Sequence, residues 1–281
     1  MNDIKISILL PTRGRTDQLD RSVSSLLELA DNPEQIQWLF GFDKDDLDSY
    51  KWFQEHTLPK IAESGGIYSC LSFEPMGYIR LHEYVNKLAK FATGDWFVFW
   101  NDDAVMKTQG WDAEIIKSTG EFCLQAFDTH KKHPYSIFPI VPKEWYDLIG
   151  HLSQHQLNDA WLSQIAWMMD IVKQIPVVVE HDRFDLTGNN QDATFKNRVI
   201  YEGNPNDPRD FNYVDCRKMR IEEANKISAY LLTKDYPLVH WRKVCSGEAG
   251  PWDKMLAADV NGHLKEFKTA PITKASESTN G

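Results

Sequence analysis

The chain has 281 residues, with 31 basic and 41 acidic side chains and a formal net charge of −10 at pH 7. Its 42% hydrophobic and 26% charged residues are typical of a folded globular protein and exclude a disordered or fibrous chain. The acidic excess argues against binding nucleic acid or an anionic membrane through bulk charge, although a local basic groove stays compatible with it.

Neither a secretion signal nor a membrane span is predicted. The first ten residues lack a basic start followed by a long apolar core, and no apolar run reaches the roughly 18 residues of a span. The four cysteines are scattered without the spacing of a zinc site or a disulfide framework. We therefore expect a soluble, cytoplasmic protein.

The first hundred residues alternate between strand and helix patterns. The predicted strands cover residues 4–10, 37–42 and 96–100, and the predicted helices cover 19–30, 52–61 and 79–91. This alternation predicts a parallel α/β sheet with helices on both faces.

After residue 105 the pattern is less regular. Strands are predicted over 123–127, 137–141 and 177–180, and helices over 157–174 and 217–234. We divide the chain into a first half, residues 1–105, and a second half of the same domain, residues 106–200. A helical C-terminal extension over 201–268 and a disordered tail over 269–281 complete the prediction.

Three predicted strands end in polar clusters, and the carboxyl ends of parallel strands meet at one edge of a sheet, where ligands bind. The clusters are Thr12-Arg13 with Arg15, Asp43 with Asp45, and Asp102 with Asp103. Adjacent carboxylates suit Mg²⁺ or Mn²⁺, which bridge protein carboxylates to substrate phosphates. The alternative for an isolated Asp-Asp pair is a solvated turn, but its position after an apolar strand favours the cation site.

The segments PTRGR, GFDKDD and GYIRLHEYVNKLAKFATGDWFVFWNDDA resemble, in this order, the nucleotide-sugar-binding half of GT-A glycosyltransferases close to the inverting family 2. The resemblance covers about the first 105 residues. It implies a GT-A-like α/β fold, with a mainly parallel sheet flanked by helices. It also implies a hexosyl- or pentosyltransferase that uses a nucleotide-sugar donor, UDP in the first place, together with Mn²⁺ or Mg²⁺. Residues 106–200 would then bind the acceptor.

The resemblance also implies roles for individual residues. These are Pro11 and Thr12 at the nucleotide, Asp43 with Asp45 at the base, Arg80 in the following helix region, Asp102 at the ribose and Asp103 at the metal. Asn101 stands where the usual motif begins with Asp, so the division of labour between the two aspartates stays open. Arg13, Arg15 and Arg80 could neutralise the leaving diphosphate, and solvation at the surface is the alternative for the first two.

An inverting transfer needs a general base for the acceptor hydroxyl. Asp159 opens a predicted helix where this family often places its base, and a helix-capping role is the alternative. Glu144 and Asp147 are weaker candidates. A later histidine often completes the metal site in this fold, and His181 is favoured over His240 because the loop after it resembles the corresponding loop of related transferases.

The acceptor stays open between a glycan and 5-hydroxymethylcytosine in phage DNA. The short, tailless build and the PTRGR-type start resemble bacteriophage-encoded transferases, which act in the host cytoplasm and reach a base by flipping it. The negative charge argues against DNA. Six tryptophans follow the aspartate pair and could stack on sugars or bases or form the core: Trp111, Trp145, Trp161, Trp167, Trp241 and Trp252. A non-catalytic nucleotide-sugar or glycan-binding module of the same fold is the alternative function. The oligomeric state is not predicted.

Overall fold

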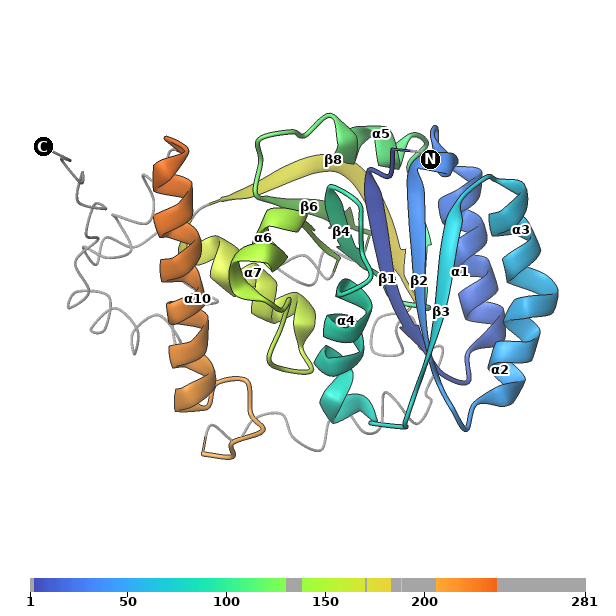
Figure 1. The fold of residues 1–281 in the computed structure, drawn as a ribbon, viewed down its shortest axis with the longest axis horizontal. Helices are drawn as coiled ribbons and strands as arrows, with labels where there is room; N and C mark the ends of the chain where they lie inside the picture. Colours follow the sequence, from blue (N-terminus) through green and yellow to red (C-terminus); the bar gives the residue numbers. More distant parts are fainter. Residues whose placement is uncertain (1–2, 130–137, 170, 183–187, 189–205, 237–281) are drawn as a thin grey trace, which may run out of the picture.

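The computed structural model describes residues 3–129, 138–169, 171–182, 188 and 206–236. Its strands form one sheet in the order β3-β2-β1-β4-β7-β6-β8-β5 (Figure 1). The strands are β1 (Ile6–Thr12), β2 (Ile36–Asp43), β3 (Ile67–Phe73), β4 (Trp96–Phe99), β5 (Ala104–Met106), β6 (Cys123–Asp128), β7 (Pro139–Pro142) and β8 (Val172–His181). The α-helices are α1 (Thr16–Glu28), α2 (Leu47–Trp52), α3 (Leu58–Glu63), α4 (Leu81–Ala89), α5 (Trp111–Ile116), α6 (Lys143–Ile149), α7 (Asn158–Met168) and α10 (Val214–Thr233).

Strands β1 to β4 form the parallel part of the sheet. β1 lies between β2 and β4, with Leu9 opposite Leu39 on one side and Phe99 on the other. Every residue of β2 is buried, as expected for a parallel strand that is covered on both faces. The ends of β1, β2 and β4 therefore meet at one edge, and the predicted alternation of strands and helices is confirmed.

The second part of the sheet is mostly antiparallel. β7 pairs antiparallel with both β4 and β6, β8 runs parallel to β6, and β5 pairs antiparallel with β8. The sheet is therefore mixed. Parallel pairings still outnumber antiparallel ones, four to three.

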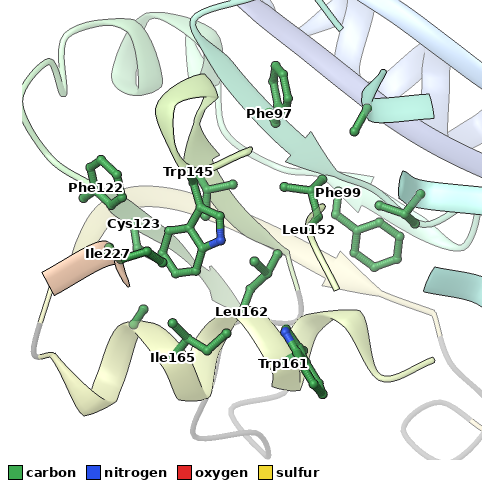
Figure 2. Close-up of a cluster of buried hydrophobic side chains, with 14 of the residues drawn as sticks. Phe97, Phe99, Phe122, Cys123, Trp145, Leu152, Trp161, Leu162, Ile165 and Ile227 are labelled. Carbon is green, nitrogen blue, oxygen red and sulfur yellow. The ribbon is translucent and has the colours of Figure 1, made fainter. Parts of the chain in front are cut away.

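Two apolar cores cover the two faces of the sheet. On one face, α1 packs Leu19, Val23 and Leu26 against the strands. On the other face, α4, α6, α7 and α10 share a second core, in which Trp145 of α6 packs with Leu162 of α7 and other side chains (Figure 2). The sheet edge that carries the polar clusters is thus held between two independently packed layers.

Four tryptophans of the second half belong to these cores. Trp111, Trp145, Trp161 and Trp167 are at most 3% exposed. The interpretation of these four as core residues is confirmed, and they present no face to a sugar or a base. Trp241 and Trp252 lie outside the described residues.

The largest difference from the predicted elements lies between residues 157 and 181. The helix predicted over 157–174 ends at Met168, and β8 begins at Val172, so the prediction is wrong for residues 169 and 171–174. The apolar run around Ile171 fits either element, and pairing with β6 decides for the strand. Pro176 lies where the register of β6 and β8 shifts, which is where a sheet interior tolerates proline.

β3, β5 and α5 were not predicted, whereas the helix predicted over 217–234 is confirmed as α10. The tail 269–281 and His240 lie outside the described residues. No helix in the described part of the chain is long and apolar enough to cross a membrane.

Candidate nucleotide and metal site

A continuous chain of polar contacts runs along the carboxyl edge of the sheet. Thr12 Oγ1 donates to Asp102 Oδ2 at 2.8 Å. Arg15 Nη1 lies 2.7 Å from Asp102 Oδ1 and 3.2 Å from Asp103 Oδ2, so one guanidinium bridges both carboxylates. His181 Nε2 lies 3.0 Å from Asp103 Oδ1. Five residues predicted from the sequence, or from its resemblance, thus meet in one network.

Local backbone structure explains why these side chains converge. After β4, the amide of Ala104 donates to the carbonyl of Asn101, which closes a turn over the two aspartates. β5 follows at once and pairs with β8, which places Ala104 opposite His181. The amide of Asp182 also donates to the carbonyl of Asp103. The turn thus positions the carboxylates of Asp102 and Asp103, and the pairing of β5 with β8 places the imidazole of His181 next to them.

Burial and neighbouring charges shift the pKa values of the two aspartates in opposite directions. Burial raises the pKa of Asp102 above its usual value, and the negative charge of Asp103 adds to this, against the opposing effect of Arg15. Burial also opposes ionisation of Asp103, but the contact with His181 and the charge of Arg15 outweigh it. The pKa of Asp103 therefore lies below its usual value. Asp103 is the more strongly ionised carboxylate of the pair.

A second cluster surrounds Asp43 at the end of β2. Arg13 Nη1 donates to Asp43 Oδ2 at 2.7 Å, and Arg13 Nη2 donates to Asp45 Oδ2 at 2.9 Å. The Tyr84 hydroxyl donates to Asp43 Oδ1, while the same hydroxyl accepts the amide of Met76 at 2.7 Å. Both oxygens of the buried Asp43 are thereby fixed in orientation.

These contacts shift the pKa values of the partners. The hydrogen bonds to Asp45 and Asp43 raise the pKa of Arg13, and the hydrogen bond from Arg13 lowers the pKa of Asp45. Burial, together with the bond to Asp43, raises the pKa of Tyr84 to about 12. Tyr84 is therefore a hydrogen-bond donor at neutral pH.

Gly14 separates the two arginines. Its φ of +64° is a conformation that residues with a side chain rarely adopt, and its amide donates to Asp46 Oδ2 at 2.8 Å and Ser49 Oγ at 3.1 Å. The loop after β1 is therefore tied to the start of α2. Arg13 reaches the Asp43 cluster and Arg15 reaches the aspartate pair.

Asp103 and His181 fit a divalent cation as two of its ligands. Adjacent ligands of an octahedral ion with bonds of about 2.1 Å lie about 3 Å apart, which matches the separation of Asp103 Oδ1 and His181 Nε2. The other imidazole nitrogen, Nδ1, is buried and has no hydrogen-bond partner in the described structure. No set of three His, Cys, Asp or Glu residues suited to a metal occurs within the described ranges. Water and substrate phosphates would supply the other ligands.

Three predicted site residues lie apart from these contacts. Pro11 is part of β1, opposite Gly41 of β2. Arg80 lies in the 3₁₀ turn Tyr78–Arg80 and pairs with Glu83 of its own helical turn, with Nη2 2.7 Å from Glu83 Oε2. Asp159 is half-buried in the first turn of α7, and neither a hydrogen bond nor an ion pair links it to the aspartate pair across the described residues.

Two contributors were not predicted from the sequence. Tyr84 fits the apolar face of α4, and only the position of its hydroxyl beside Asp43 shows a polar role. Arg21 of α1 donates from Nη2 to Asp182 Oδ2 at 2.7 Å and so joins α1 to the end of β8. No sequence spacing indicates this long-range pair.

Solved structures share this fold. No protein-family model and no curated protein matches the sequence. The Pyrobaculum calidifontis mannosyltransferase PcManGT, in complex with GDP-Man and Mn²⁺, is 11% identical with a TM-score of 0.53, over 96% of this chain and 83% of that chain. S. aureus TarS 1–349, in complex with UDP-GlcNAc, is 12% identical with a TM-score of 0.52, over 94% and 81%. At such identities the likeness concerns the fold, and the GT-A-like fold is confirmed.

Proposed function

We propose that the protein is a metal-dependent glycosyltransferase that moves a sugar from a nucleoside-diphosphate donor, UDP in the first place, to an acceptor hydroxyl with inversion. The contact chain from Thr12 through Asp102, Arg15 and Asp103 to His181 carries this proposal. It lies beyond the carboxyl ends of parallel strands, where α/β sheets bind nucleotides. Two proteins of similar fold were solved with GDP-Man and Mn²⁺ and with UDP-GlcNAc.

The residues divide into a nucleoside end and a diphosphate end. Asp43, held by Arg13 and Tyr84, has the fixed carboxylate oxygens needed to accept the N–H groups of a base. Asp102 would accept ribose hydroxyls, and Asp103 with His181 would hold Mn²⁺ or Mg²⁺. The bound ion would stabilise negative charge on the departing diphosphate.

The acceptor end is assigned to Asp159. Its carboxylate stands in the first turn of α7 and would take the proton of the acceptor hydroxyl as the glycosidic bond forms. Arg80 would have to leave Glu83 to reach the nucleotide. The acceptor is a glycan or hydroxymethylated DNA.

The first experiment measures transfer of radiolabelled sugar from nucleotide sugars in the presence of Mn²⁺. A glycan panel and hydroxymethylated DNA are the acceptors. We expect Asp103→Asn to lose Mn²⁺-dependent activity by at least about 100-fold, and Asp159→Asn to lose transfer while still binding UDP with Mn²⁺. Asp95→Asn is the matched control, because Asp95 is exposed at the opposite end of β4 and pairs with Lys5.

Two results would contradict the proposal. Full activity in Asp103→Asn would remove the metal assignment. Tight binding of UDP with Mn²⁺ by the unmodified protein, without transfer or hydrolysis of any donor, would indicate a nucleotide-sugar-binding module instead.

A further inference from the structure

Arg15 occupies a position between the two aspartates that a cation would also favour. Its side chain is only 13% exposed, and its Nη1 contacts a carboxylate oxygen of both Asp102 and Asp103. Among ion pairs between described residues, no other lysine or arginine contacts either aspartate. Two adjacent buried carboxylates repel each other and are costly to desolvate, so Arg15 offsets this cost in the free protein.

The backbone that carries Arg15 is held by contacts within the protein. Arg15 is the residue before α1, and its carbonyl accepts the amide of Leu19 as the helix begins. The preceding residue, Gly14, is tied to Asp46 and Ser49. The guanidinium is therefore directed at the aspartates by a fixed loop.

We propose that Arg15 couples the binding of the divalent cation to the binding of the nucleotide. A divalent cation held by Asp103 Oδ1 and His181 would lie close to the positive charge of Arg15, which contacts the other oxygen of Asp103, and the two positive charges would repel each other. This lowers the affinity for the cation alone. The diphosphate of the donor carries the negative charge that offsets both positive charges, and it offers the guanidinium further oxygen partners.

This inference rests on the proposed function, because it takes a nucleoside diphosphate as the second ligand. A coupling role of Arg15 and a purely structural role change the binding affinities in different directions. Loss of a structural contact would weaken the binding of every ligand. Loss of a coupling charge strengthens binding of the cation alone and weakens binding of the nucleotide that depends on the cation.

The test measures Mn²⁺ binding to the full chain, by the paramagnetic resonance signal of free Mn²⁺, with and without saturating UDP. In Arg15→Gln, we expect Mn²⁺ alone to bind about tenfold more tightly and UDP, in the presence of Mn²⁺, about tenfold more weakly. Arg15→Lys keeps the charge, so both affinities should stay within about threefold of the unmodified protein. Lys60→Gln is the control. Lys60 of α3 pairs with Asp20 of α1, so this variant removes one positive charge from an ion pair that does not include the aspartate pair.

The outcomes separate this inference from the proposed function. If the unmodified protein binds no UDP in the presence of Mn²⁺, the proposed function fails and the coupling fails with it. If UDP and Mn²⁺ bind to the unmodified protein, but Arg15→Gln weakens the binding of Mn²⁺ without UDP or leaves it unchanged, only the coupling is overturned. Should Arg15→Gln not fold, a tenfold change in Mn²⁺ affinity in Arg15→Lys would overturn the coupling, because the charge is retained.

Discussion

Tyr84 connects the proposed nucleoside end of the site to the core of the molecule. Its ring packs in the core formed with α4, edge-on to Phe73, and its hydroxyl joins Asp43 to the amide of Met76. A single side chain therefore fixes both the carboxylate and the chain segment that precedes α4. A buried hydroxyl with two partners is costly to remove, because both partners lose a hydrogen bond.

Tyr84→Phe removes that hydroxyl and keeps the ring. We expect the free energy of unfolding to fall by about 1–2 kcal/mol, since the amide of Met76 loses its partner. The Kd for UDP should rise several-fold, because Asp43 loses one of the contacts that orient it. Urea unfolding and calorimetric titration with UDP would measure the two effects. Tyr68→Phe, at an exposed position of β3, is the control. UDP binding that stays unchanged in Tyr84→Phe would show that the Tyr84 hydroxyl does not position Asp43 for the nucleotide.

At the scale of elements, α10 holds the segment that leads into α7. Glu223 of α10 is buried and accepts hydrogen bonds from His151 Nε2 at 2.8 Å, Gln154 Nε2 at 2.7 Å and Trp161 Nε1 at 2.9 Å. All three donors belong to the residues that precede or begin α7. The helix that carries Asp159 is therefore anchored by a carboxylate more than sixty residues away in sequence.

Glu223→Ala would leave three donors without their acceptor. We expect a loss of about 2–4 kcal/mol in the free energy of unfolding, whereas Glu222→Ala should change it by no more than about 0.5 kcal/mol. Glu222 is the neighbouring residue of α10 and is exposed. Both variants change helix propensity equally, so the difference between them reports the loss of the buried contacts of Glu223. Thermal and urea unfolding of both variants would test this. Equal stability of the two variants would show that the anchor contributes nothing.

The sequence predicts well the elements whose patterns are local. β1, α1, β2 and β4 follow from apolar runs and helix spacing, and the polar residues at their ends were correctly expected at one edge. β3 was missed because its first three residues are exposed and give little apolar signal. The end of α7 was misplaced because apolar residues continue on both sides of Asp170, and only pairing with β6 distinguishes strand from helix.

The candidate site was predictable in its residue types and not in its contacts. Strand order alone brings Thr12 beside the turn that carries Asp102, so parallel topology was sufficient there. The bridging position of Arg15 depends on the conformation of one glycine and one helix start. Arg80 and Glu83 have the i,i+3 spacing of neighbours on a helix, so their pairing could have been expected from the sequence, although it was not predicted.

At the scale of the whole molecule, His155 makes stability depend on pH. It is buried, donates from Nε2 to the carbonyl of Arg209 at 2.9 Å and accepts the amide of Leu157 at Nδ1. Burial lowers its pKa to about 4, against an ordinary value of 6.5. The unfolded chain therefore takes up a proton at a higher pH than the folded protein does.

The sign of the effect follows from this difference. The contribution of His155 is fully present above pH about 6.5 and is lost as the pH falls towards 4, by an amount of the order of 2–3 kcal/mol. Asp45 and Asp103, whose pKa values are lowered, lose their contributions at more acidic pH. We expect His155→Gln to flatten the profile between pH 6.5 and 4 in urea unfolding. A slope equal to that of the unmodified protein in this range would rule out His155 as its source.

The register of β8 against β5 has a consequence for changes of chain length. Successive residues of a strand face opposite sides of a sheet. Deleting one residue between Val177 and Glu180 would place Asp182 opposite Ala104 and turn His181 to the other face. The irregular pairing around Pro176 offers a place where an added residue can be absorbed before it reaches the site. Substitutions along this strand should therefore be tolerated far better than single-residue deletions after Pro176.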